Sequence, residues 1–128
     1  MNDPSIRIKL KNVTKRFGIG DAEISALDNV DLTVKKGEFI AIMGPSGCGK
    51  TTLLNMIGLL DQPSDGEYYL DNRPVDFLTP RQRAQIRSKQ IGFIFQNFNL
   101  VPRLTVIDNV ALPLTYTGLG KIKRLQEA

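Results

Sequence analysis

The residues best suited to chemistry form a glycine-rich loop at positions 44–52, GPSGCGKTT. Its spacing is the G-x-x-x-x-G-K-[ST] of a phosphate-binding loop, set by Gly44, Gly49, Lys50 and Thr51. Glycines let the backbone wrap closely round an anion, so that several N–H groups point at one centre. A helix that begins near Lys50 would add its unpaired N–H groups and its positive end. The loop therefore predicts a site for a polyphosphate.

Individual side chains of the loop have predicted roles. Lys50 should reach the β- and γ-phosphates as a point charge, which makes it a candidate catalytic residue. Thr51 should place its hydroxyl on Mg²⁺. Cys48 is interpreted as a small loop filler, with a reactive thiol beside a helix N-terminus as the alternative. The predicted nucleotide-binding residues of the loop are Gly44, Pro45, Ser46, Gly47, Cys48, Gly49, Lys50 and Thr51.

The segments on either side of the loop indicate the elements that position it. Phe39–Met43 is a short unbroken apolar run, which is typical of a buried parallel strand. After the loop, apolar residues recur at helical spacing, namely Leu53, Leu54, Ile57 and Leu60. The motif counts only between a strand and a helix, so this context favours a ligand site over a mere glycine-rich turn.

Further strands are predicted around this segment. Ile6–Val13 and Val30–Val34 alternate apolar and polar residues, which predicts an antiparallel β layer beside the loop. Glu67–Asp71 is a short strand, and Ile91–Phe95 is a second buried strand that ends at Gln96.

Capping patterns predict helices in the second half of the chain. Thr79–Gln82 offers threonine as the N-cap, proline at the first helical position and glutamine in the capping-box position. Thr105 should cap a helix that continues through Leu112, and Pro113 should kink or end that helix. Lys121–Ala128 should begin another helix.

The composition limits the classes of function. The chain has 128 residues, one cysteine, no histidine and a net charge of +4, which suits one domain in a reducing cytoplasm without an internal disulfide. Its apolar runs are too short for a membrane span, and we expect no signal peptide. Basic residues alternate with apolar ones near the start, which we interpret as the solvent-facing side of a strand: Arg7, Lys9, Lys11, Lys15 and Arg16. A nucleic-acid surface is the alternative, but no nucleic acid is predicted as a partner, because no fingerprint of such a module is present.

These motifs together resemble the ATP-binding subunit of ABC transporters. The resemblance rests on the loop at 44–52, on IGFIFQ at 91–96 and on NFNLVP at 97–102. The stretches at 26–47 and 104–114 add to it, so that it covers almost the whole chain. Other phosphate-loop classes fit less well, because the N-K-x-D and D-x-x-G motifs of small GTPases are absent. Small nucleotide kinases usually have the loop at the very N-terminus, whereas here 43 residues precede it.

The resemblance implies an α/β fold. It would be the P-loop NTPase core of an ABC ATPase with an antiparallel β subdomain, truncated at the start of the helical subdomain. The core with its β subdomain would occupy residues 1 to about 96, and the Q-loop with the start of the helical subdomain residues about 96 to 128. The stretches at 57–71 and 98–114 look most like the branch that drives lipoprotein release and macrolide-type export.

The resemblance also assigns roles to residues outside the motif. Phe17 falls where the family stacks an aromatic ring on adenine, and core packing is the alternative. Thr52 would bond the α-phosphate and so joins the nucleotide-binding residues. Gln96 would be the Q-loop glutamine, a catalytic and metal-contacting residue that touches Mg²⁺ or the attacking water. A capped strand end is the alternative for Gln96.

The implied function is MgATP binding and hydrolysis coupled to transport across a membrane, by export or lipoprotein release. Residues 97–112 would carry much of the face that docks on an ABC permease. The apolar members of this segment, Phe98, Leu100 and Val101, would form that surface or pack in a core. A second ATP-binding subunit would complete a homodimer. Such a subunit would be cytoplasmic and peripheral on the inner face of the cell membrane.

Three motifs that the family needs for hydrolysis are missing. These are an apolar strand that ends in Asp-Glu, an LSGGQ-type signature and a switch histidine, and the sequence contains no histidine at all. We therefore expect the chain to be the N-terminal half of a longer subunit and to be inactive as an ATPase alone. A nucleotide-binding fragment without turnover and a non-transport ABC ATPase are the alternative functions.

Overall fold

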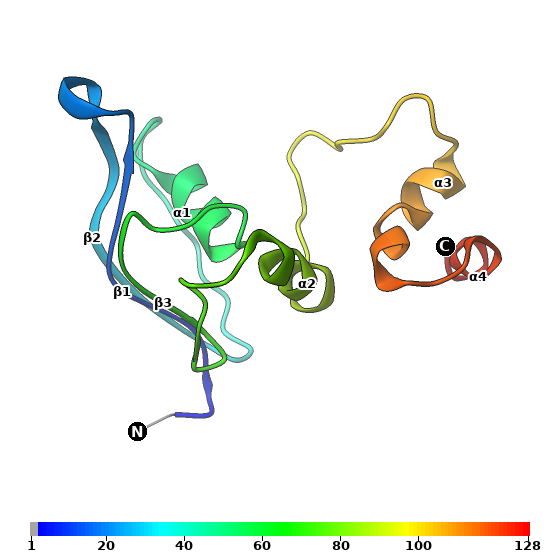
Figure 1. The fold of residues 1–128 in the computed structure, drawn as a ribbon, viewed down its shortest axis with the longest axis horizontal. Coiled ribbons are helices and arrows are strands. Elements are labelled where there is room, and N and C mark those ends of the chain that lie inside the picture. The colour runs from blue at the N-terminus through cyan, green and yellow to red at the C-terminus, as the bar shows by residue number, and fades with distance from the viewer. Residues whose placement is uncertain (1–2) are drawn as a thin grey trace. The chain divides into compact units, whose positions relative to one another are not determined.

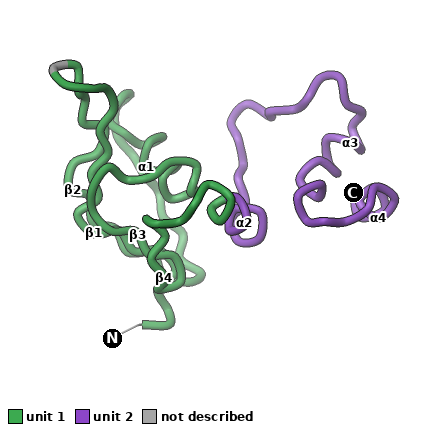
Figure 2. Tube along the Cα trace, in the orientation of Figure 1, with its two compact units in different colours: residues 1–83 green, residues 84–128 purple. Residues whose placement is uncertain are grey.

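Figure 1 shows the fold of this chain, and Figure 2 colours its two compact units. The computed structural model describes residues 3–128. Unit 1 ends at Arg83, and unit 2 runs from Ala84 to Ala128. The elements, in chain order, are β1 (Ile6–Phe17), η1 (Gly20–Ala22), β2 (Ile24–Lys35), α1 (Lys50–Ile57), β3 (Asp65–Leu70), β4 (Arg73–Pro74), α2 (Pro80–Gln90), α3 (Val106–Ala111), η2 (Pro113–Thr117) and α4 (Lys121–Glu127).

Unit 1 contains a four-stranded antiparallel sheet of order β2-β1-β3-β4. Leu10 of β1 pairs with Leu32 of β2 on one side and with Tyr68 of β3 on the other. The predicted antiparallel β layer is therefore confirmed, although β1 and β2 are longer than the alternation indicated. Shifts in register interrupt the pairing of β1 with β2 on both sides of Lys15. Such bulges change the direction in which a side chain points.

The core of unit 1 joins the sheet to the end of α1. The largest fully buried side chains are Tyr68, Leu10, Met56, Leu59 and Val13. The Tyr68 hydroxyl also donates a hydrogen bond of 2.7 Å to the Ile57 carbonyl, at the last residue of α1. Burial of each such apolar side chain stabilises the fold by about 1.5–3 kcal/mol. The core therefore holds α1 against the sheet at the end opposite to its first turn.

Two predicted strands are wrong. Phe39–Met43 and Ile91–Phe95 have no regular structure and no strand neighbour among the described residues. They are not buried either, since Phe39 is 93% exposed and Ile94 is 103% exposed. A parallel strand satisfies its N–H and C=O groups through neighbouring strands, so an apolar run without such neighbours stays irregular.

The helices of the second half begin where the capping patterns predicted. At the start of α2, the Gln82 N–H donates to Thr79 Oγ1 at 3.3 Å, and the Thr79 N–H donates to Gln82 Oε1 at 2.9 Å. At the start of α3, Thr105 Oγ1 accepts from the Asp108 N–H at 3.2 Å. Pro113 opens η2 directly after that helix. Within residues 3–128, no helix is long and apolar enough to cross a membrane.

Candidate functional site

The loop at 44–52 uses backbone conformations that suit glycine. Gly47 and Gly49 have φ angles of +80° and +88°, a region that other residues enter at a cost of about 1–2 kcal/mol. Space is also restricted at Gly49, because an added Cβ would lie 2.4 Å from the Ala26 carbonyl oxygen. Glycine at position 49 therefore permits both the left-handed backbone of the turn and the close approach of the loop to β2.

The Lys50 ammonium is held against the backbone of its own loop. Its Nζ donates to the Gly44 carbonyl at 2.9 Å and to the Pro45 carbonyl at 2.6 Å. It also lies 3.6 Å from Cys48 Sγ. An ammonium has three N–H groups, so two are engaged by carbonyls and the third faces a weak sulfur acceptor. The loop therefore carries a positive charge whose position is set by its own carbonyl groups.

The first turn of α1 adds further donors to the loop. α1 begins at Lys50, with Gly49 as its N-cap and no acidic side chain in its first turn. The N–H groups of a first turn have no intrahelical partner, and the helix dipole makes that end positive. The Thr51 side chain is exposed there, and Thr52 is half-buried. N–H groups, an ammonium and hydroxyls suit phosphate, and a hydroxyl oxygen suits Mg²⁺, so the residues present fit a magnesium nucleotide.

Phe17 is the last residue of β1 and belongs to the same unit as the loop. It is 46% exposed, which disfavours the alternative of core packing. The Lys15 ammonium lies over its ring, 5.0 Å from the ring centroid. The interpretation of Lys15 as solvent-facing is wrong, because its side chain is only 13% exposed. The bulges on both sides of Lys15 break the alternation on which that interpretation depended.

Gln96 and the predicted docking residues belong to unit 2. Gln96 is exposed and follows the stacked rings of Phe93 and Phe95, whose centroids are 5.6 Å apart. Phe98 and Leu100 are 87% and 65% exposed, which disfavours core packing for them. Phe17 and the glycine-rich loop at 44–52 thus belong to one unit, and Gln96 belongs to the other.

Unit 2 contains an apolar groove of about 320 Å³ between residues 100 and 110. It is lined by Leu100, Val101, Pro102, Leu104, Val106, Asn109 and Val110. The Asn109 side chain holds the backbone around it. Its Nδ2 donates to the Val101 carbonyl at 3.2 Å and to the Thr105 carbonyl at 3.0 Å, and its Oδ1 accepts from the Val101 N–H at 2.8 Å. This role was not predicted from the sequence. The available signal was an amide among the apolar residues of the predicted helix, since a partly buried amide needs polar partners.

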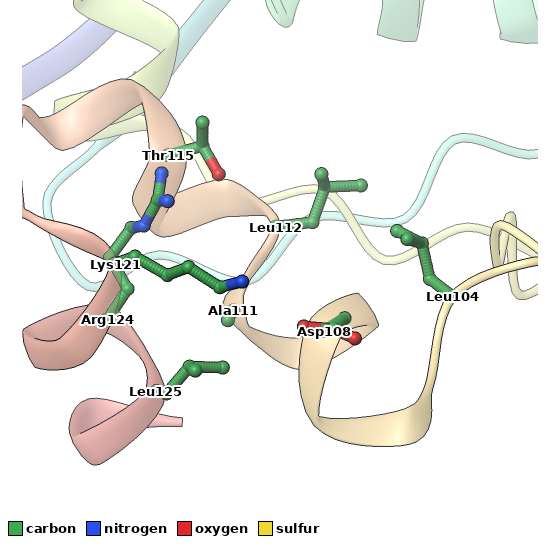
Figure 3. Close-up of a pocket in the computed structure, with 8 residues that line it drawn as sticks. All are labelled: Leu104, Asp108, Ala111, Leu112, Thr115, Lys121, Arg124 and Leu125. Carbon is green, nitrogen blue, oxygen red and sulfur yellow. The ribbon is translucent and has the colours of Figure 1, made fainter.

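A second hollow of about 150 Å³ lies among α3, η2 and α4 (Figure 3). Asp108 lines it from α3, and Lys121 and Arg124 line it from α4. The other lining residues are Leu104, Ala111, Leu112, Thr115 and Leu125. None of the residues predicted to bind nucleotide or metal is among these lining residues, so this hollow does not belong to the predicted site.

Comparisons of the sequence with known proteins agree on one family. The family described as ABC transporter matches residues 27–128. MJ0796 of Methanocaldococcus jannaschii, an uncharacterized ABC transporter ATP-binding protein, is 54% identical over 113 residues, which cover 88% of this chain and 48% of the relative. The macrolide export ATP-binding/permease protein MacB of Syntrophobacter fumaroxidans is 47% identical over 113 residues, which cover 88% of this chain and 16% of the relative.

The structural comparison leads to the same family. The dimeric structure of MJ0796, a bacterial ABC transporter cassette, matches with a TM-score of 0.83 and 49% identity, over 93% of this chain and 53% of that chain. A dimeric post-hydrolysis structure of the same ATP-binding cassette, bound to ADP and Pi, also matches with a TM-score of 0.83, at 48% identity and with the same coverage of both chains. The chain thus spans about half the length of MJ0796. The predicted resemblance and α/β fold class are confirmed, and the chain belongs to the ABC transporter family.

Proposed function

We propose that this chain binds MgATP through the loop at 44–52, as part of a subunit that couples ATP hydrolysis to transport. The observation that carries the proposal is the Lys50 ammonium, held by the Gly44 and Pro45 carbonyls at the first turn of α1. Its third N–H faces Cys48 Sγ at 3.6 Å, and a charged phosphate oxygen is a much stronger acceptor than a thiol sulfur. Phosphate binding would therefore replace one weak contact and leave both carbonyl contacts intact.

Each predicted residue would have a separate task at this site. The loop N–H groups and Lys50 would hold and neutralise the β- and γ-phosphates, while Thr52 would bond the α-phosphate. Thr51 and Gln96 would hold Mg²⁺, which when bound neutralises charge on the phosphate oxygens. Phe17 would stack on adenine, which any ring face can do with little selectivity among bases.

Turnover would require groups beyond those of this sequence. The sequence has no strand that ends in Asp-Glu, no signature motif and no histidine. The MJ0796 cassette is described as dimeric and as bound to ADP and Pi after hydrolysis. We infer that subunits of this kind pair around nucleotide, and that the 128 residues taken alone bind ATP without hydrolysing it.

Coupling to transport would use the segment at 97–112. Phe98 and Leu100 expose large apolar surfaces there, and the apolar groove opens beside Leu100. Exposed apolar patches of this kind mark sites for partner proteins. The name of the relative MacB joins ATP-binding and permease functions. We therefore propose a permease as the partner, export or lipoprotein release as the process, and the inner face of the membrane as the location.

Substitution of Lys50 tests the nucleotide site. A charge-assisted hydrogen bond contributes about 1.5–3 kcal/mol, so Lys50→Ala should weaken MgATP binding by about 10- to 150-fold. Isothermal titration calorimetry measures the change, with Lys36→Ala, at an exposed lysine in the turn after β2, as the matched control. Unchanged affinity in Lys50→Ala would show that nucleotide does not bind at this loop.

A further inference from the structure

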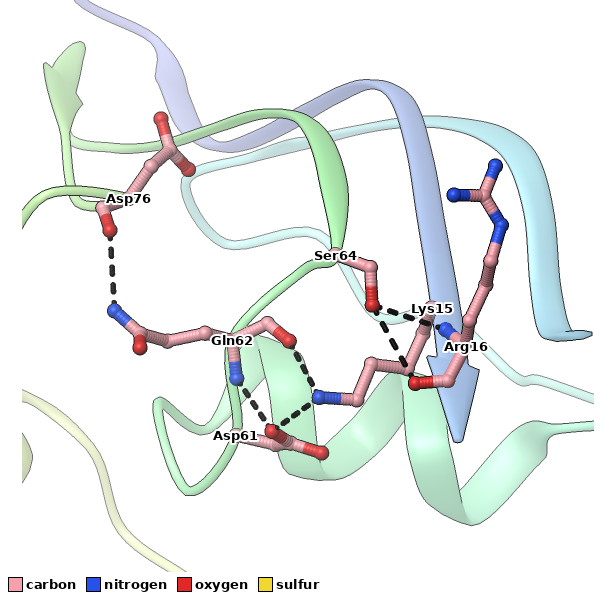
Figure 4. A network of polar contacts seen from close by, with 6 residues as sticks. All are labelled: Lys15, Arg16, Asp61, Gln62, Ser64 and Asp76. Atoms are coloured by element: carbon pink, nitrogen blue, oxygen red, sulfur yellow. Dashed lines mark hydrogen bonds and ion pairs between the residues drawn. The ribbon is translucent and has the colours of Figure 1, made fainter. Parts of the chain in front are cut away.

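A polar network ties the end of β1 to the turn that follows α1 (Figure 4). Lys15 Nζ donates to Asp61 Oδ1 at 2.6 Å and to the Gln62 carbonyl at 2.8 Å. Further along the turn, Ser64 Oγ accepts from the Arg16 N–H at 3.0 Å. The turn therefore holds the last part of β1 through both a side chain and the backbone.

The same lysine ammonium faces an aromatic ring. Lys15 Nζ lies 5.0 Å from the centroid of the Phe17 ring, inside the range of about 6 Å in which a cation is attracted to a ring face. The Lys15 side chain is 13% exposed, so its charge is largely shielded from water, which strengthens this attraction. Phe17 itself is 46% exposed, so part of its surface remains available to a ligand.

We propose that Lys15 is a positioning residue for the nucleobase, because it holds the Phe17 ring in the orientation that stacks on adenine. The inference rests on the proposed function, since it takes the loop and Phe17 as parts of one ATP site. A cation on one face of a ring draws π-electron density toward itself. The opposite face then becomes a better partner for an electron-rich purine.

The bonds from Lys15 to Asp61 and Gln62 also connect the base site to the phosphate site. α1 runs from Lys50 to Ile57, so its first turn meets the phosphates, and the turn beyond its other end holds Lys15 through Asp61 and Gln62. A helix is a rigid spacer because its backbone groups bond to one another. The network therefore sets the distance between the stacked base and the triphosphate, which favours a nucleotide over inorganic triphosphate.

β1 offers a matched control for this contact. Lys11 Nζ lies 5.3 Å from the centroid of the Tyr69 ring and 3.2 Å from Glu67 Oε2. The chemistry is the same, but the Lys11 side chain is 46% exposed, and the contact joins β1 to β3 instead of to the turn after α1. Lys11→Met therefore removes an equivalent lysine without disturbing the proposed connection.

The test compares MgATP with magnesium inorganic triphosphate, by isothermal titration calorimetry on the full chain. Lys15→Met should weaken ATP binding about fivefold or more, within the range of cation–π contacts, and should leave the binding of inorganic triphosphate unchanged. Lys15→Arg keeps a cation that can pair with Asp61 and lie over the ring, so it should retain the parent affinity for ATP. Lys11→Met should change neither affinity.

A second variant keeps the test decisive if Lys15→Met does not fold, as judged by circular dichroism. Asp61→Asn leaves the lysine in place but removes the charge that anchors it, and should also weaken ATP selectively. If the affinities for ATP and for inorganic triphosphate fall equally, Lys15 supports only α1, and the proposal is overturned. Unchanged ATP affinity in the folded variants would overturn it too. Failure of the parent chain to bind either ligand would contradict the proposed function itself, so the two failures are distinguishable.

Discussion

The glycine-rich loop at 44–52 and the apolar segment that leads into it obtain their structure in different ways. The loop is held by contacts with residues near it, since Lys50 Nζ bonds two carbonyls of the same loop and Gly49 packs against the β2 backbone. Phe39–Met43 precedes it directly but is irregular, with Phe39 93% exposed and Met43 87% exposed. A tight loop depends on a few nearby groups, whereas a buried strand depends on partner strands in a sheet.

The same contrast recurs later in the chain. Thr105 caps α3 with a bond to a residue three positions away, and the helix forms as predicted. Ile91–Phe95 is as apolar as a buried strand but has no strand neighbour in the part of the chain that the structure describes. Exposed apolar runs of this kind promote association between molecules. In this sequence the capping patterns therefore predicted helices correctly, whereas the two unbroken apolar runs predicted strands that do not form.

Within the loop, the largest effect on stability is expected at Gly49, where the loop meets β2. Gly49→Ala should lower the free energy of unfolding by about 2–4 kcal/mol, because the left-handed backbone is costly for alanine and the new Cβ has no room. Urea unfolding followed by circular dichroism measures the loss. Gly92→Ala is the control from an apolar segment, since an added Cβ meets nothing within 4 Å there. Equal stability of the two variants would contradict the tight packing of the loop.

A smaller loss of stability is expected at low pH, when Asp61 in the turn after α1 becomes protonated. Burial alone would raise the pKa of the Asp61 carboxyl, but hydrogen bonds from Lys15 and from the Gln62 N–H outweigh burial and hold this pKa below its ordinary value of 3.8. Because the folded pKa is the lower one, the stability from these bonds is present above pH 3.8 and is lost as the pH falls through the folded pKa.

Asp61→Asn should therefore be less stable than the parent chain at neutral pH, and the difference should shrink in acid. Urea unfolding at neutral pH and at a pH below the folded pKa measures the two differences. A gap between variant and parent that stays constant with pH would show that the carboxylate charge does not contribute.

The smallest effect on stability is expected in the apolar segment at 91–95. Ile94→Asp should change the free energy of unfolding by no more than about 0.5 kcal/mol, because Ile94 is fully exposed. Leu10→Ala, at a residue that is 1% exposed, is the contrasting variant and should cost about 2–5 kcal/mol. Light scattering should show weaker self-association in Ile94→Asp. A loss of stability as large as that of Leu10→Ala would show that the segment is buried.

Much of the fold could be predicted because its determinants are local. Thr79 and Thr105 cap their helices through bonds to residues three positions away. α1 begins at Lys50, directly after Gly49, which adopts the left-handed backbone conformation that ends the loop. The alternation in Ile6–Val13 indicates a strand whose two faces meet different surroundings. The apolar runs failed as predictors because hydrophobicity specifies burial only where other elements cover the run.

The candidate site was proposed from its motif, and its supporting contacts became visible only in the structure. The spacing of the loop glycines and Lys50 is itself the signal of a phosphate site. The contacts of Lys15 could not be predicted from the sequence, because they depend on bulges in β1 and on the approach of Asp61 from a distant turn. The contacts of Asn109 were not predicted, because its amide bonds to the backbone of Val101 and to the carbonyl of Thr105. Both partners lie before the first residue of α3.

The rate of alkylation of Cys48, with and without saturating MgATP, tests most directly whether the loop holds a triphosphate. Cys48 is the one cysteine of the sequence, its thiol is exposed, and its sulfur lies 3.6 Å from Lys50 Nζ. A bound phosphate chain would cover the thiol, so a nucleotide concentration of about ten times Kd should slow labelling about tenfold. Equal labelling rates at saturating MgATP would contradict phosphate binding at this loop.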